Sequence, residues 1–147
     1  MSTGITDPAL CQRRAVTFAR DAEELLAIEN QWFAVAAFYA AYQLVRSALI
    51  VDPVFADLAR LHAIDTSLQP EDRLAHVHAA RRGKGHAAPG VNDLVQKLYP
   101  SIRVRYLRLH SASVAVRYEI GIGAYRSVDL MGDLVTVRSA VDAGLAA

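Results

Sequence analysis

The stretch WFAVAAFYAAYQLVRSALIV, residues 32 to 51, decides how this chain can fold. Its length alone would allow it to cross a membrane, but its uninterrupted apolar run covers only 11 residues, Trp32 to Tyr42. Gln43, Arg46 and Ser47 then break the run, whereas a membrane span needs about 20 predominantly apolar residues. A helix that is apolar nearly all round is typical of the centre of a bundle. We therefore expect no membrane contact, and a buried central helix from about residue 30 to 51.

Amphipathic segments flank this central stretch, and strand signals are few. The first helix is expected from about residue 8 to 27, with Asp7 as its N-cap and Pro8 at its first position. A shorter helix after Pro53 would place Val54, Leu58, Leu61 and Ile64 on its apolar side. Further helices are expected to start near residue 70, to run from 92 with Asn92 as the cap, to continue past Pro100 to about 120, and to cover 127 to 143. The sequence predicts an all-α fold: an antiparallel bundle of four to five main helices with one or two short extra helices, in a single domain, 1–147, with its core at about 8–143.

The N-terminus and the cysteine content indicate a cellular compartment. Cys11 is the only cysteine, so the chain cannot form an internal disulfide. The opening residues MSTGITDPAL lack the basic and apolar regions of a signal peptide. We expect a cytoplasmic protein.

The net charge of +1 hides a strong asymmetry along the chain. Residues 1 to 72 hold five basic and ten acidic residues, residues 73 to 118 hold nine and one, and residues 119 to 147 hold two and four. A basic middle third of this kind predicts contact with phosphate or nucleic acid. It is equally consistent with contact to an acidic helix of the same chain, of a dimer mate or of an acidic protein partner.

Two segments resemble the HEPN domains, a superfamily of small helical bundles. The segments are NQWFAVAAFYAAYQLVRSAL, from Asn30, and YLRLHSASVAVRYE, from Tyr106, with its Tyr, Leu, Ser and Arg-Tyr pattern. His86 before an amphipathic helix is also similar to the interhelical histidine of the family. The resemblance implies an antiparallel bundle, a homodimer and, in many members, a metal-independent endoribonuclease of toxin or defence type. Other members are non-catalytic interaction or scaffold modules, often beside a nucleotidyltransferase.

The nucleases of that family carry an arginine and a histidine separated by four to six residues. Arg105 with His110, Arg73 with His78 and Arg81 with His86 all have this spacing. Because the family motif lies on or just after the helix that starts the second half of the bundle, Arg105, His110 and Arg117 are the candidate catalytic residues. His110 would act as the acid or base, and Arg105 or Arg117 would hold the phosphate. On a regular helix Arg105 and His110 lie roughly 140° apart. Arg103, His110 and Arg117 recur every seven residues and share a face with Ser113. Tyr106 and Ser113 are expected to pack the bundle.

A Gly, Lys and His-rich segment supplies the candidate phosphate-binding residues. They are Arg81, Arg82, Lys84 and His86, with Arg103 on the following helix; a solvated basic loop is the alternative. His76 and His78 lack a completing set of ligands, so neither a metal site nor a cofactor is expected. RNA or a nucleotide is the expected ligand if the chain is not an interaction module.

Overall fold

A computed structural model describes residues 6–78, 88–119 and 121–147 of the chain. Within these residues the fold is all-α, with no strand. The six α-helices are α1 (Pro8–Ala27), α2 (Phe33–Val51), α3 (Leu58–Ile64), α4 (Val91–Leu98), α5 (Arg103–Tyr118) and α6 (Ser127–Asp142). Two short 3-10 segments, η1 (Pro53–Ala56) and η2 (Pro70–Leu74), accompany them. The expected all-α class is confirmed.

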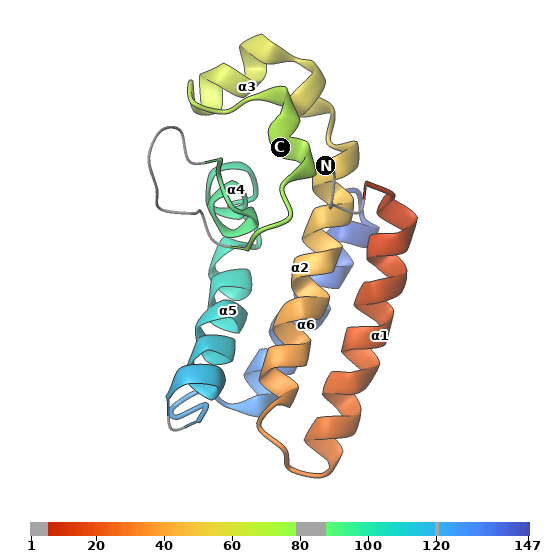
Figure 1. Ribbon diagram of the computed structural model, residues 1–147, viewed down its shortest axis with the longest axis vertical. Helices are drawn as coiled ribbons and strands as arrows, with labels where there is room; N and C mark the ends of the chain where they lie inside the picture. Colours follow the sequence, from red (N-terminus) through yellow and green to blue (C-terminus); the bar gives the residue numbers. More distant parts are fainter. Residues whose placement is uncertain (1–5, 79–87, 120) are drawn as a thin grey trace.

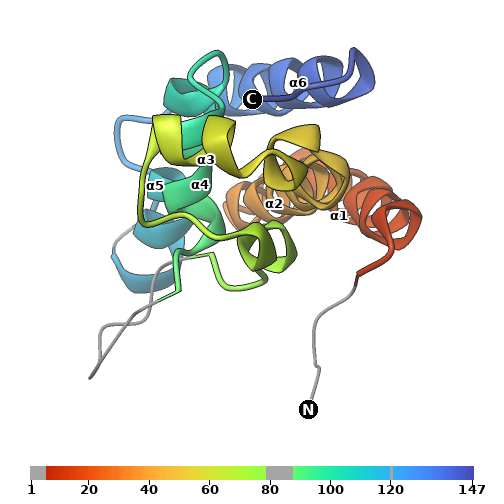
Figure 2. The same ribbon diagram turned by 90° about the horizontal axis from the view of Figure 1, so that it is seen from above.

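Helix α2 is the centre of the molecule. It packs against α1 most extensively, and also against α5 and α6 (Figures 1 and 2). Seventeen of its 19 residues are buried, as the apolar stretch predicts. By length and composition this helix could cross a membrane, but 83% of the candidate window is buried inside the protein. Such burial is what a core helix of a bundle shows.

Small residues explain the close pairing of α1 and α2. The buried face of α1 consists of Cys11, Ala15, Ala19 and Ala22, and α2 presents a series of alanines to its neighbours. Asp7 caps α1 by accepting a hydrogen bond from the amide of Ala9 at 2.9 Å, as expected. Glu29 follows α1 with a φ of 57°, the left-handed conformation that reverses the chain into α2.

Two details of the sequence prediction are wrong. Gly90, and not Asn92, is the N-cap of α4, and its amide donates to the Asp93 carboxylate at 3.0 Å. Asn92 is buried and accepts a 2.8 Å hydrogen bond from the Tyr106 hydroxyl, because a polar side chain inside the core needs a partner. The second wrong detail concerns the apolar side expected after Pro53. Val54 and Leu61 are buried there, but Leu58 and Ile64 are exposed.

The end of α2 is tied to distant segments by Asp52, a buried carboxylate. It accepts hydrogen bonds from the amide of Val54 at 2.9 Å, from the hydroxyl of Tyr99 at 2.7 Å and from the amide of Ala147 at 2.9 Å. These bonds give the buried side chain the hydrogen-bond partners that a polar group needs in the interior. They fix the upper end of α2 in Figure 1 relative to α4 and to the last residue of the chain.

Candidate functional site

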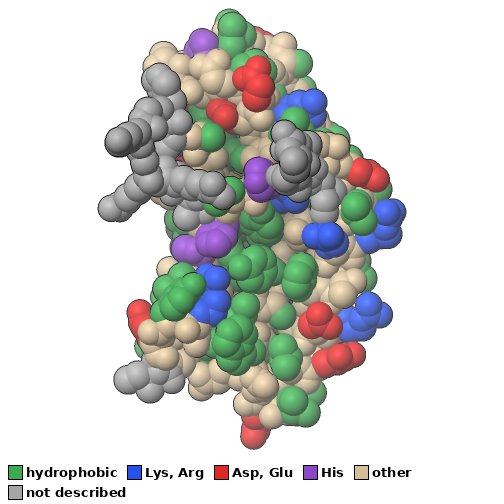
Figure 3. All heavy atoms as spheres, in the orientation of Figure 1, with side chains coloured by type: hydrophobic (Ala, Val, Ile, Leu, Met, Phe, Trp, Pro, Cys, Tyr) green, Lys and Arg blue, Asp and Glu red, His purple; other side chains and the backbone are tan. Residues whose placement is uncertain are grey.

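Two histidines that are distant in the sequence meet beside α2. His110 is on α5 and His78 follows η2, and their ring centroids are 5.8 Å apart. Both rings contact Phe38 of α2, with centroid distances of 5.0 Å for His110 and 6.1 Å for His78. Both side chains are half-buried. Figure 3 shows histidine side chains next to a basic side chain on the face of the molecule seen in Figure 1.

The segment that carries His78 is held on both of its sides. The amides of Val91 and Asn92, at the start of α4, donate to the carbonyls of Val77 at 2.7 Å and His78 at 2.9 Å. These amides belong to the first turn of a helix and have no partner within it, so they are available to the preceding chain.

Helix α2 holds the same segment from the other side. The Tyr42 hydroxyl donates to the carbonyl of His76, and Arg46 Nε donates to the carbonyl of Ala75 at 3.2 Å. The backbone carbonyls around His78 are therefore held by α2 and by α4, and the imidazole of His78 lies beside that of His110.

Arg117 completes the cluster. Its guanidinium donates to the Ser113 carbonyl, to Ser113 Oγ and to the Tyr39 hydroxyl, each at 3.4 Å. These distances are long for hydrogen bonds, so the interactions are weak. Among the described residues no carboxylate lies within ion-pair distance of Arg117. Its charge is therefore available to an anion from outside the chain.

The positive charge of Arg117 acts on both imidazoles. Burial, and then Arg117, lower the pKa of His78 below its usual value. For His110 burial again comes first, and the charges of His78 and Arg117 lower its pKa further. Two neighbouring imidazoles beside a cation resist carrying two protons at once. Both shifts favour the neutral imidazoles, and a proton on one ring disfavours a second proton on the other.

Arg105 is placed elsewhere. Its guanidinium lies 3.8 Å from the carboxylate of Asp133 on α6, which also receives two 2.6 Å hydrogen bonds from Arg108. The separation of roughly 140° between Arg105 and His110 that helical geometry predicts explains this, because the two side chains leave α5 in different directions. The structure thus brings His110 together with Arg117, and it brings Arg105 together with Asp133.

The expected phosphate-binding residues fall in two groups. Arg103 is exposed at the start of α5 and donates to the carbonyl of Gln96 at 3.3 Å. Arg81, Arg82, Lys84 and His86 lie outside the described residues. Across the described ranges no three His, Cys, Asp or Glu side chains gather as metal ligands.

The sequence analysis did not identify His78 or Tyr39 as members of this site. His78 follows Arg73 at the same spacing as His110 follows Arg105, which is a signal that the sequence contains. The spacing cannot reveal that α4 holds His78 by its backbone. Comparisons with family models, with curated proteins and with solved structures return no match for this chain.

Proposed function

We propose that this chain is an HEPN-like antiparallel bundle that binds RNA and cleaves it without a metal ion, at His78, His110 and Arg117. The observation that carries the proposal is the convergence of two imidazoles and a cation that has no carboxylate partner among the described residues. Metal-independent cleavage of RNA needs a base, an acid and a positive charge at the phosphate. The basic middle third of the chain, which contains all three side chains, favours an anionic substrate.

In this mechanism His110 is the base. Burial, and then the positive charge of a protonated His78, lower the pKa of His110, so His110 is the neutral ring when His78 carries the proton. The neutral imidazole takes the proton of the ribose 2′-hydroxyl, and the 2′-oxygen attacks phosphorus. The bond from phosphorus to the 5′-oxygen breaks, and His78 gives its proton to that oxygen. The products are a 2′,3′-cyclic phosphate and a free 5′-hydroxyl.

Arg117 holds the phosphate in this scheme. Its contacts to Ser113 and Tyr39 are weak enough to be exchanged for phosphate oxygens, whose charge grows as the 2′-oxygen attacks. The bound phosphate also offsets the charge of Arg117, so substrate binding raises the pKa values of both histidines. The acid form of His78 is then populated when it is needed.

The experiment measures cleavage of a mixed single-stranded and structured RNA pool in EDTA. The wild-type protein is compared with His78→Ala, His110→Ala and Arg117→Ala, with folding matched by circular dichroism. Each variant is expected to lose about 10²- to 10⁴-fold in rate. His76→Ala is the matched histidine control, because its exposed side chain is two residues from His78. Arg105→Ala is the matched arginine control, and both controls should retain activity.

Two outcomes would overturn the proposal. If Arg105→Ala abolishes cleavage while Arg117→Ala does not, the phosphate is held at Arg105. If the wild type cleaves no RNA between about pH 4 and 8, the range in which histidines titrate, the chain is not a ribonuclease of this kind. A non-catalytic interaction module would then be the working account, and an acidic protein partner of the basic third would be sought.

A further inference from the structure

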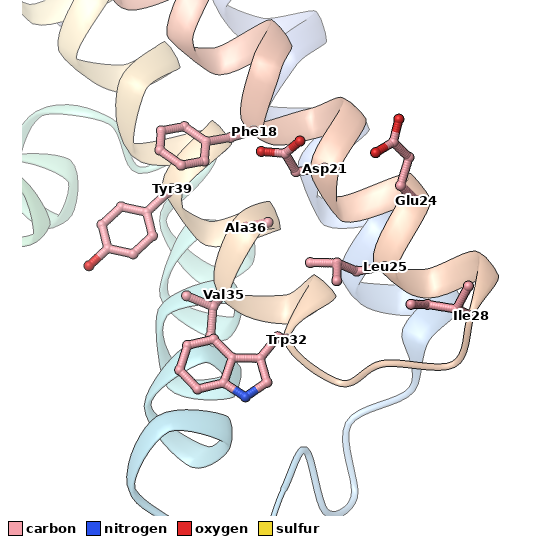
Figure 4. Close-up of a pocket in the computed structure, with 9 residues that line it drawn as sticks. All are labelled: Phe18, Asp21, Glu24, Leu25, Ile28, Trp32, Val35, Ala36 and Tyr39. Carbon is pink, nitrogen blue, oxygen red and sulfur yellow. The ribbon is translucent and has the colours of Figure 1, made fainter.

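A groove between α1 and α2 has the size and the composition of a small-molecule site. Its volume is about 450 Å³, and pockets for small molecules range from about 300 to 1,000 Å³. Figure 4 shows that side chains from α1, from α2 and from the connection between the two helices surround it. Most of them are apolar or aromatic, and the charged ones are two carboxylates, Asp21 and Glu24. A mostly apolar hollow with a few polar groups is typical of a site that binds a small organic molecule.

The groove is bounded along its length. At one end Phe18 of α1 packs against Tyr39 of α2, with the ring centroids 5.7 Å apart. At the other end lie Ile28 and Trp32, the residues that flank the connection between the helices (Figure 4). From Phe18 to Ile28 the helix rises by about 15 Å. A site of this limited length suits a small molecule better than a partner helix that would run through it.

The charge of the groove is on its α1 side. Asp21 is half-buried, and Glu24, three residues later, lies on the same side of the helix. In the part of the chain that the structure describes, neither carboxylate forms an ion pair. Glu24 is in the last turn of α1, where the helix dipole disfavours a negative charge and where no basic residue compensates it. A cation from outside the chain would be attracted to both carboxylates.

Arg117 carries the opposite charge at the α2 side of the groove. Its guanidinium carbon is 6.0 Å from the centroid of the Tyr39 ring, and it donates a hydrogen bond to the Tyr39 hydroxyl. A cationic ligand would avoid this side and place its positive group beside Asp21 and Glu24. Its apolar body would then lie against Trp32, which is 51% exposed in the unoccupied groove.

We propose that the α1–α2 groove binds a small organic cation, a molecule with an apolar body and one amine or quaternary ammonium group. Asp21 and Glu24 attract the positive group, and Trp32 with its apolar neighbours covers the body. An anionic amphiphile of the same size would be repelled by the two carboxylates. The inference goes beyond RNA cleavage, because no part of it uses the histidine pair.

Binding of decyltrimethylammonium to the full chain, below the concentration at which it forms micelles, tests the proposal. Trp32 is the only tryptophan, so its fluorescence reports on the groove. The emission is expected to shift to shorter wavelength and to saturate, with one ligand per chain by isothermal titration calorimetry. Decyl sulfate has the same alkyl chain with the opposite charge, and tetramethylammonium has the charge alone. Each is expected to bind at least about tenfold more weakly than decyltrimethylammonium.

Two variants and a matched control locate the site. Asp21→Asn/Glu24→Gln is expected to weaken binding about tenfold, because the attraction for the positive group is lost. Trp32→Ala, measured by calorimetry, is expected to weaken binding about tenfold, because the apolar body loses part of its cover. Glu23→Gln is the control, since it removes the same charge from an exposed position of α1 that does not line the groove. It should bind as the wild type does.

The proposal fails if decyltrimethylammonium produces no saturable change at one ligand per chain. It also fails if decyl sulfate binds as tightly as the cation, because the groove would then select for apolar surface alone. A loss in Glu23→Gln as large as that in Asp21→Asn/Glu24→Gln would overturn it too, because the effect would then follow the net charge. None of these measurements depends on cleavage. Binding of the cation by a chain that cleaves no RNA would support this inference while overturning the proposed function.

Discussion

His78 and His110 lie with their ring centroids 5.8 Å apart, although one follows a 3-10 segment and the other is in the middle of α5. Phe38 of α2 contacts both rings. Burial first, and then nearby positive charge, lower the pKa of both rings, and these shifts make the stability of the protein depend on pH.

We expect the free energy of unfolding to fall as the pH falls below about 6.5, the ordinary pKa of histidine. The folded state lowers the pKa of both His78 and His110, so the unfolded chain binds protons more strongly in this range. The loss continues until the pH reaches the lowered pKa values of the folded state. Urea unfolding at a series of pH values, with His110→Gln for comparison, measures this contribution.

His76→Gln is the matched variant for this comparison, because it removes an exposed imidazole two residues from His78. In Arg117→Gln the pKa values of both histidines should rise, since a nearby positive charge is removed. Nuclear magnetic resonance titration of the imidazole protons reports these values. A fall in either pKa would contradict the electrostatic role given to Arg117.

The second prediction concerns Asp133, which is 1% exposed and forms ion pairs with Arg105 and Arg108. Arg108→Ala should lower the free energy of unfolding by about 1–3 kcal/mol, because the buried carboxylate loses two 2.6 Å hydrogen bonds. Arg105→Ala should cost less than about 1 kcal/mol, since Arg105 is half-exposed and 3.8 Å away. Chemical denaturation of the two variants compares them. Equal losses would show that Arg105 supports Asp133 as strongly as Arg108 does.

The third prediction concerns the buried pair Tyr106 and Asn92. Tyr106→Phe leaves the Asn92 side-chain oxygen without its 2.8 Å donor inside the core. We expect a loss of about 1–3 kcal/mol in the free energy of unfolding, because a buried acceptor without a partner keeps its desolvation cost. The double variant Tyr106→Phe/Asn92→Leu should recover part of this loss. If the single variant is as stable as the wild type, the hydrogen bond contributes nothing.

The fourth prediction concerns Glu29, which has a φ of 57° after α1. Glycine adopts this conformation without the steric cost that a Cβ atom imposes. Glu29→Gly should therefore raise the free energy of unfolding by up to about 1 kcal/mol, as measured by thermal or urea unfolding. The control is Glu24→Gly, which introduces glycine into the body of α1 and should destabilise it by about 1 kcal/mol. A loss of stability in Glu29→Gly would contradict the strain assigned to this turn.

The helices were predictable from the sequence because each has a local cause. Asp7 and Pro8 start α1, Pro53 follows the end of α2, and the run from Trp32 to Tyr42 makes α2 the core. The buried face of α5 was also predictable, since Tyr106 and Ser113 fall at helical spacing and both are fully buried. The role of Asn92 was predicted wrongly, because an asparagine side chain that can cap a helix can also accept a hydrogen bond from a buried tyrosine hydroxyl.

The candidate site was predictable only in part. His110 and Arg117 lie on one face of α5, and this periodicity is visible in the sequence. The position of His78 depends on bonds from the start of α4 and from two α2 side chains, Tyr42 and Arg46. Long-range backbone contacts of this kind leave no periodic signal. The partner of Arg105 was equally hidden, because Asp133 is on a different helix.

The backbone bond from Asn92 to His78 has a consequence for how this protein can vary. His78 ends one described range and Asn92 lies in the first turn of α4, so the bond joins two positions that are distant in the sequence. A connection whose two ends are pinned together can be lengthened, shortened or exchanged without moving either end. A change in the number of residues between these two positions would therefore leave His78 beside His110.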